Sequence, residues 1–534
     1  MTTKSTEMAR VSAKGGFHLL WGLVASTLIS AVGTIIIAGL LGADNYGLYA
    51  VALAAPNLIA NFRDWGINTA IIKYSAQYNS ENNVAKIRSV FVSGLLFEIV
   101  LGLLLSLFSF TLSGFLATIF NRPAITALIQ IASFFILIGG LINAATAAFT
   151  GMETMHLNSI MLIVQSIVKT ALIVTLVLFG LGTLGAVTGF TYASLIAGLT
   201  GIFLMFTIYK SFPKPTSSKI EIIATTKTMF KYGLPISIGG ILTGFLVQFY
   251  SWIMAIYVSN NAIIGNYTVA LNFVVLITFF SLPVTTMLFP AFSKLDAQKD
   301  QALFKNVFQY SVKYASVIVV PITTMVMALA QPGIGTIFAN RYVDAPLFLV
   351  LSSITYLYTA LGSLSAGNLI NGQGYTTFNL KMSVLTAAIG FPLSFILISK
   401  FGVIGLIVTS LVVSLPSLFL SLRFIKMHFG VSVDWVSSGK ILFSSGLAAI
   451  VSYVLLSQLA FSNPIKLIIG LITFVIVFIA TAIVTRTVNK SDLTNLREIS
   501  NGLGILRKPL NSIINLLEKL IKILHAENQK QVTE

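Results

Sequence analysis

Residues 39–74 read GLLGADNYGLYAVALAAPNLIANFRDWGINTAIIKY, and most of this stretch is apolar enough to lie in a lipid bilayer. Arg63 and Asp64 nevertheless stand side by side in its middle, and Trp65 and Gly66 follow them. A charge in hydrocarbon is costly, so the charged residues of membrane segments usually face protein or water. The stretch therefore predicts a membrane helix that passes close to a polar interior.

The composition of the whole chain indicates a polytopic membrane protein. Of its 534 residues, 56% are hydrophobic and 9% are charged, far less charge than a soluble surface requires. The chain has no cysteine, which excludes disulfides and thiolate metal sites, and its four histidines show no metal-ligand spacing. We expect no bound metal and no cofactor, and we assign no catalytic residue.

Apolar segments of about 20 residues, long enough to cross a bilayer as helices, recur along nearly the whole chain. The first follows a basic N-terminus and is longer than the core of a cleaved signal peptide, so we expect it to be retained. The fourteen predicted spans are 17–41, 46–62, 89–113, 124–149, 157–179, 184–209, 234–258, 263–291, 306–330, 345–370, 376–398, 402–422, 441–459 and 464–485.

The distribution of lysine and arginine predicts the orientation of these spans. If the N-terminus is cytoplasmic, 28 of the 33 basic residues lie in cytoplasmic segments or near the cytoplasmic ends of spans, four lie in outer loops or near the outer ends of spans, and Lys169 lies in the middle of a span. This distribution predicts a multi-pass protein of the cell membrane with both termini in the cytoplasm. Attraction to anionic membrane lipid then accounts for the net charge of +17, and nucleic acid is not needed as a partner.

Similar segments separated by about 220 residues indicate an internal duplication. YGLYAVALAAP at 46–56 resembles IGNYTVALNFV at 264–274, and LGTLGAV at 181–187 resembles FGVIGLI at 401–407. The glycines that follow the fourth and tenth spans also correspond. A repeat unit of six spans returns the chain to its starting side, so the two copies form a parallel repeat about an axis along the membrane normal.

The expected fold is an all-α membrane protein with 14 transmembrane helices, arranged as two pseudo-symmetric six-helix lobes plus two C-terminal helices. The expected parts are an N-lobe, a cytoplasmic linker, a C-lobe, helices 13 and 14, and a cytoplasmic tail, at 1–209, 210–231, 232–427, 428–488 and 489–534. Two homologous bundles that merely pack together are the alternative to lobes that frame a transport path. The apolar face of residues 513–524 predicts an amphipathic tail helix, either on the membrane surface or docked onto the transporter body or a partner enzyme.

The stretch at 39–74 also resembles the N-terminal signature of polysaccharide and oligosaccharide flippases. Their superfamily includes the multidrug-and-toxin extruders and the lipid II flippase. The shared pattern is a short glycine-containing outer turn, then Tyr-Gly-x-Tyr, then a glycine followed by small residues at the inner end of the second span. The resemblance implies a V-shaped two-lobed bundle that moves a lipid-linked sugar by alternating access. It also implies a second span that continues through a glycine break, with cavity cations near Arg63.

Polar residues on one helical face are candidates for a substrate cavity. Asn57, Asn61 and Asp64 lie at i, i+4 and i+7, so one helix would place them on one face. Arg63 can pair with Asp64 or bind an anionic substrate. The alternative is that the span ends at Phe62, which would leave Arg63 and Asp64 at the membrane interface.

Lys169 lies near the centre of its span, too far from either end to reach the interface easily, and it shares a face with Gln165. Glu98 is also in the middle of a span, and an unpaired buried charge costs several kcal/mol. Either Glu98 and Lys169 form a structural pair, or Lys169 faces the cavity as a point charge for phosphate while Glu98 tunes it. Further amides that either bind sugar or join helices are Asn143, Gln248 and Asn368.

Transport by alternating access is therefore the expected function. The expected substrate is an oligosaccharide on polyprenyl phosphate or pyrophosphate, moved from the cytoplasmic to the outer leaflet for cell-surface glycan assembly. No P-loop is present, so the energy would come from a gradient of Na⁺ or H⁺ or from removal of the product. A cation-coupled multidrug extruder is the alternative, and a glycan polymerase or ligase is disfavoured because the outer loops are short. Membrane lipids and glycan-assembly enzymes are further candidate partners.

Overall fold

The computed structural model describes residues 2–212, 221–293, 295, 301–487, 497 and 515. This part of the chain is almost entirely helical and contains no strand. Ten of its helices are long and apolar enough to cross a membrane, or eleven if one bent helix pair is a single span. The expectation of an all-α, multi-pass protein is confirmed. The predicted tail helix at 513–524 lies, apart from residue 515, outside the described residues.

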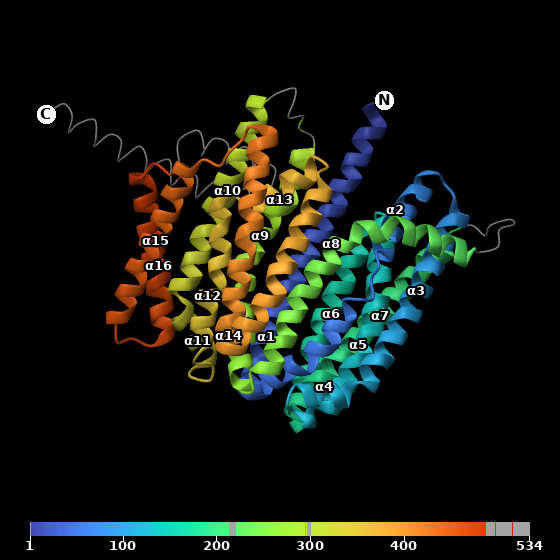
Figure 1. Cartoon of the computed structure of the whole chain (residues 1–534), viewed down its shortest axis with the longest axis horizontal. Helices are drawn as coiled ribbons and strands as arrows, with labels where there is room; N and C mark the ends of the chain where they lie inside the picture. Colours follow the sequence, from blue (N-terminus) through green and yellow to red (C-terminus); the bar gives the residue numbers. More distant parts are fainter. Residues whose placement is uncertain are drawn as a thin grey trace. The chain divides into compact units, whose positions relative to one another are not determined.

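The helices are shown in Figure 1. The first half contains α1 (Thr2–Ala60), α2 (Ile67–Ser80), α3 (Val84–Thr111), α4 (Ser113–Ile119), the 3-10 turn η1 (Pro123–Ile125), α5 (Thr126–Gly151), α6 (Met155–Leu176), the π segment η2 (Val177–Leu181) and α7 (Gly182–Ser211). The second half contains α8 (Ile222–Tyr257), α9 (Asn261–Ser293), α10 (Gln301–Ala328), α11 (Ala330–Phe338), α12 (Ala345–Leu357), the 3-10 turn η3 (Tyr358–Leu361), α13 (Ser363–Gly372), α14 (Thr376–Phe429), α15 (Trp435–Gln458) and α16 (Asn463–Val484).

Glycines interrupt three of the longest helical stretches. Gly42, with φ of 72°, breaks α1, and Gly402, with φ of 56°, breaks α14. Between α6 and α7, Gly182 adopts φ of 47° and ψ of −129°. A side chain would be strained at such angles, so glycine is the residue that permits these breaks.

Unusual backbone geometry recurs at the spacing of the sequence duplication. Gly402 has ψ of −129°, the same as Gly182, and the two glycines occupy equivalent places in the similar segments 181–187 and 401–407. Further left-handed residues pair at nearly the same separation: Asn121 with Ala339, and Glu153 with Gly374. Three turns of the first half therefore have counterparts in the second half, while the superposition of whole lobes stays a prediction.

One compact unit comprises Met1–Phe279, Ile337–Ser352 and Ile370–Arg423. Within it α5 packs against both α3 and α7, and α1 packs along α6 (Figure 1). A Cβ on Gly33 of α1 would collide with the side chain of Thr170 on α6. Small residues thus allow these two helices to approach closely, as they do at many helix crossings in membranes.

Arg122, in the turn after α4, ties that turn to the end of α8. Its guanidinium donates hydrogen bonds to the carbonyl oxygens of Ala255 at 2.8 Å, Val258 at 2.7 Å and Ser259 at 3.0 Å. Its Nε donates to Asn261 Oδ1 at 2.6 Å. Carbonyl groups at the C-terminal end of a helix lack partners within the helix, so the guanidinium of Arg122 satisfies the hydrogen-bonding capacity of carbonyls at the end of α8.

The second unit comprises Phe280–Thr336, Ser353–Leu369 and Phe424–Glu534. In it α15 and α16 form a hairpin, and α15 packs against α10 (Figure 1). Asp434 caps the start of α15, because its Oδ1 accepts a hydrogen bond from the backbone N–H of Ser437 at 3.2 Å. Ile468, Ile472 and Ile476 of α16 are largely exposed, which is typical of a helix face in contact with lipid.

Candidate functional site

A cavity of about 600 Å³ lies in the first unit between α1, α6, α7, α9 and the end of α11. This volume falls in the range of about 300–1,000 Å³ that small-ligand sites occupy. The wall is mostly apolar, and its polar lining residues are Ser26, Thr27, Ser30, Thr34, Gln165, Ser166, Lys169 and Asn272. Lys169 is the only charged residue among the described residues that line the cavity.

Lys169 and Gln165 reach the cavity from α6, where their spacing of one turn places them on one face. Lys169 is half-buried. Within the described ranges, no hydrogen bond or ion pair involves its side chain. An ammonium group in an apolar wall without a carboxylate partner attracts an anion, and a compact point charge of this kind suits a phosphate group.

The polar lining contributed by α1 was not predicted from the sequence. Ser26, Ser30 and Thr34 recur every four residues, so they follow one face of this helix. Ser30 Oγ donates a hydrogen bond to Ser166 Oγ of α6 at 3.0 Å. The regular spacing of these hydroxyls was the signal available in the sequence, although hydroxyls also join packed helices.

Asn272 of α9 was also missed. Its Nδ2 donates a hydrogen bond to Tyr46 Oη of α1 at 2.9 Å, which fixes the orientation of the amide beside the cavity. In the duplicated segments, Asn272 stands where the first copy has Ala54. A polar residue that replaces an apolar one within a similar segment was the available signal.

Arg63 and Glu98 form a buried ion pair that does not line the cavity. Arg63 Nε lies 3.1 Å from Glu98 Oε2, and the exposed fractions of the two side chains are 8% and 0%. Arg63 Nη1 donates to the carbonyl oxygen of Ile136 at 2.8 Å. Asn68 Nδ2 donates to Glu98 Oε1 at 2.8 Å. Both charges are therefore satisfied by protein groups.

Two consecutive glycines of α5 make room for this ion pair. A Cβ on Gly139 would lie 2.6 Å from Arg63 Nη1, and one on Gly140 would lie 2.8 Å from Glu98 Oε2. Both distances are too short for real Cβ contacts, so any larger residue would displace the paired groups. The glycine pair thus allows the backbone of α5 to pack directly against the side chains of Arg63 and Glu98.

Of the two readings left open for Glu98 and Lys169, the structural pair is wrong, because Glu98 pairs with Arg63. Because α1 ends at Ala60, the turn that follows carries Arg63 against α3 and α5, where it meets Glu98. Lys169 lines the cavity beside α1 instead. The sequence indicated that Glu98 and Lys169 each lie in the middle of a span, but it did not reveal which helix faces meet.

The expected polar face of Asn57, Asn61 and Asp64 is also wrong, because Asp64 lies beyond the end of α1. Asp64 Oδ1 accepts a hydrogen bond from the backbone N–H of Gly66 at 2.9 Å in the turn before α2, so it does not pair with Arg63. Asn61 Nδ2 donates to the carbonyl oxygen of Ile241 in α8 at 2.8 Å. The helix of the second predicted span therefore ends at Ala60, close to the alternative end at Phe62. The next helix, α2, begins after Gly66, which has a left-handed backbone conformation.

The remaining candidate amides are not among the residues that line the cavity. They are half-buried and lie on different helices: Asn57 on α1, Asn143 on α5, Gln248 on α8 and Asn368 on α13. Asn368 Nδ2 donates to the carbonyl oxygen of Leu364 in its own helix at 2.8 Å. Of the ten predicted site residues, the structure brings Gln165 and Lys169 together at the cavity.

Comparisons with known proteins agree with this membrane architecture. A family model described as "Polysaccharide biosynthesis protein" matches residues 12–296. The "Uncharacterized membrane protein MJ1068" of Methanocaldococcus jannaschii is 21% identical over 388 residues, which cover 68% of this chain and 74% of that protein. The "Probable low-salt glycan biosynthesis flippase Agl15" of Haloferax volcanii is 21% identical over 293 residues, which cover 53% of this chain and 59% of that protein.

Among solved structures, the fold is similar to that of the lipid II flippase MurJ in an inward closed conformation. The TM-score is 0.68 at 13% sequence identity, and the match covers 88% of this chain and 98% of that chain. At this identity the likeness concerns the fold alone.

Proposed function

Because the chain belongs to the polysaccharide biosynthesis protein family, we propose that it translocates a lipid-linked oligosaccharide from the cytoplasmic to the outer leaflet of the cell membrane. The name of the H. volcanii relative and the fold shared with the lipid II flippase support a cargo of this class. The observation that carries the proposal is the cavity in which Lys169 is the charged lining residue.

The chemistry of the cavity suits the two polar parts of such a cargo. The ammonium of Lys169 would bind the phosphate or pyrophosphate that joins lipid and sugar. Sugar hydroxyls both donate and accept hydrogen bonds, and Ser30, Gln165 and Asn272 supply matching hydroxyl and amide groups. Alternating access of this cavity to the two sides would move the polar head, with an ion gradient or product removal as the energy source.

A cation-coupled multidrug extruder fits the cavity less well. Such a transporter is expected to place a carboxylate in the cavity, where it would bind the coupling ion or a cationic drug. No carboxylate occurs among the described lining residues. Glu98, the buried acid of the first unit, is already paired with Arg63.

We also propose the full count of fourteen spans in two parallel lobes. The breaks at Gly42, Gly182 and Gly402 would divide three long helical stretches into two spans each, and the bent pair of α12 and α13 would form one more. The recurring left-handed turns support a duplication. Residues 17–209 should then superpose on 234–422 by a rotation of about 180° about the membrane normal.

The topology can be tested with single cysteines, because the chain contains none. Lys400 and Glu81 are both exposed, and we expect them on the outer and cytoplasmic sides respectively. Lys400→Cys should react with a membrane-impermeant maleimide in intact cells, whereas Glu81→Cys should react only after permeabilisation. The reverse pattern, or labelling of both from outside, would contradict the proposed orientation and span count.

Depletion of the protein in its host tests the proposed function. A lipid-linked glycan should accumulate, and it should be protected from a glycosidase added outside intact cells. Re-expression of the wild-type chain should return the glycan to the outer leaflet. Unchanged glycan exposure after depletion would contradict the proposal.

A further inference from the structure

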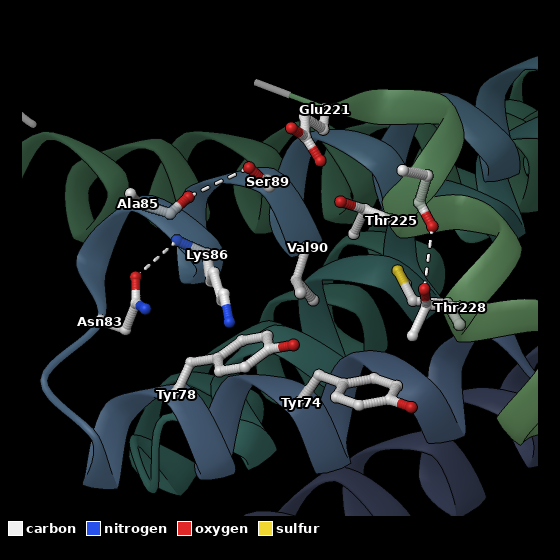
Figure 2. A pocket seen from close by; sticks show the side chains of 12 residues that line it. Tyr74, Tyr78, Asn83, Ala85, Lys86, Ser89, Val90, Glu221, Thr225 and Thr228 are labelled. Carbon is white, nitrogen blue, oxygen red and sulfur yellow. Dashed lines mark hydrogen bonds between the residues drawn. The ribbon is translucent and has the colours of Figure 1, made fainter. Parts of the chain in front are cut away.

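A second pocket, of about 430 Å³, lies where α2, the start of α3 and the start of α8 meet (Figure 2). Tyr74 and Tyr78 line it from α2, Lys86 from α3, and Thr225 from α8, with Glu221 at the residue before α8. It shares no lining residue with the cavity that contains Lys169. By the expected orientation, it opens at the cytoplasmic side.

The aromatic wall of this pocket is held in place by its neighbours. The rings of Tyr74 and Tyr78 stack with centroids 5.9 Å apart, and Tyr232 of α8 packs edge-on against Tyr74 at 5.7 Å. The ammonium of Lys73 lies 3.7 Å from the centre of the Tyr232 ring. The wall is therefore pre-organised, which lowers the entropic cost of binding a ligand.

Polar groups in this pocket have capacity to bind a ligand. Figure 2 shows the side chain of Lys86 extending toward Tyr78, and its ammonium lies 5.1 Å from the centre of that ring. No ion pair joins Lys86 to Glu221 in the part of the chain that the structure describes. Over the same residues, the hydroxyls of Tyr74 and Tyr78 have no hydrogen-bond partner. The ammonium of Lys86, two neutral tyrosine hydroxyls and the carboxylate of Glu221 thus line the same pocket.

We propose that this pocket binds a sugar, and, resting on the proposed function, that it holds the glycan part of the lipid-linked substrate on the cytoplasmic side. Sugar hydroxyls donate to the carboxylate of Glu221 and accept from Lys86, Tyr74 and Tyr78. A phosphate group is anionic, so the carboxylate of Glu221 repels it, while the ammonium of Lys86 repels a cation. The tyrosine rings add apolar surface for the C–H faces of a sugar ring.

Hydrogen–deuterium exchange of the full chain in lipid nanodiscs tests this proposal. The probes are N-acetylglucosamine, glucose, galactose and mannose, each at millimolar concentration, and the free oligosaccharide released from the host's lipid-linked glycan. We expect at least one probe to slow exchange in residues 74–90 and 221–229. Tyr78→Ala should weaken that binding about tenfold.

A matched control is available on α10. There the ring of Tyr310 stacks on that of Tyr314 one turn away, with centroids 5.8 Å apart, as Tyr74 and Tyr78 do. Tyr310→Ala should leave sugar binding unchanged, which separates loss of the pocket from general effects of removing a stacked tyrosine. Tyr78→Phe keeps the ring but removes the hydroxyl, so it should weaken binding less than Tyr78→Ala.

Two results would overturn the proposal. One is absence of protection by every sugar probe in the folded protein. The other is protection by inorganic phosphate, or by nanodiscs that contain phosphatidylglycerol, in place of sugar, which would assign the pocket to a lipid headgroup. Lys169→Gln should keep sugar protection at this pocket. Transport without sugar protection would refute this inference and leave the proposed function standing. Sugar protection without transport would refute the proposed function, and with it the assignment of the pocket to a transported glycan, but would leave the sugar site.

Discussion

Lys169→Ala is expected to abolish transport while the protein still folds and inserts in the membrane. Lys169 is the charged lining residue of the 600 Å³ cavity, and no described residue pairs with it. Its removal should weaken binding of an anionic head by about 30-fold or more, because losing one partner of a desolvated charge pair costs about 2 kcal/mol or more. The measurement is rescue of glycan exposure in depleted cells, with membrane expression measured in parallel.

Two companion variants make this result interpretable. Lys169→Arg should retain part of the activity, since the charge survives although its geometry changes. Gln165→Ala removes a neutral lining residue one turn away on the same face of α6 and should reduce transport less than Lys169→Ala. Full activity in Lys169→Ala would remove Lys169 from the substrate site.

Arg63→Met should destabilise the protein by about 3–5 kcal/mol, because it leaves the carboxylate of Glu98 buried without its cation. Glu98 is 0% exposed, and its Oε2 lies 3.1 Å from Arg63 Nε. The double variant Arg63→Met with Glu98→Gln should recover most of the loss, since no uncompensated charge remains. Thermal unfolding of the purified protein in one detergent compares the single and double variants.

Asp64→Asn provides the control for this ion pair. It changes an adjacent charge whose carboxylate accepts backbone hydrogen bonds at the start of α2, so we expect a loss of about 1 kcal/mol. If the double variant is as unstable as Arg63→Met, the two side chains do not act as a coupled pair. If it folds but fails to transport, the ion pair has a role beyond stability.

The all-helical, multi-pass character could be predicted from the sequence because hydropathy is a property of whole segments. Every predicted span overlaps a described helix, and the breaks at Gly182 and Gly402 fall in the segments that the duplication identified. A mid-span lysine also has few favourable environments, so the cavity position of Lys169 could be anticipated from its depth in the span and its polar neighbour Gln165.

The partners of the other charged residues could not be predicted in this way. The pairing of Arg63 with Glu98 depends on the turn after Ala60, which redirects the chain toward α3 and α5. Helices that are apolar on all sides give no preferred face, so the rotations of α5 and α8, and hence the positions of Asn143 and Gln248, were not set by sequence periodicity. Hydroxyls such as Ser30 were missed because they also occur where helices merely pack.

The most direct test of the central claim is translocation by the purified protein in liposomes that contain lipid-linked glycan extracted from the host. A glycosidase added outside should digest nearly the whole glycan pool when the wild-type protein is present, because glycan from the inner leaflet reaches the outside. With Lys169→Ala, digestion should stop at the outer-leaflet fraction, as in liposomes without protein. Equal digestion with and without the wild-type protein, or full digestion with Lys169→Ala, would contradict the account.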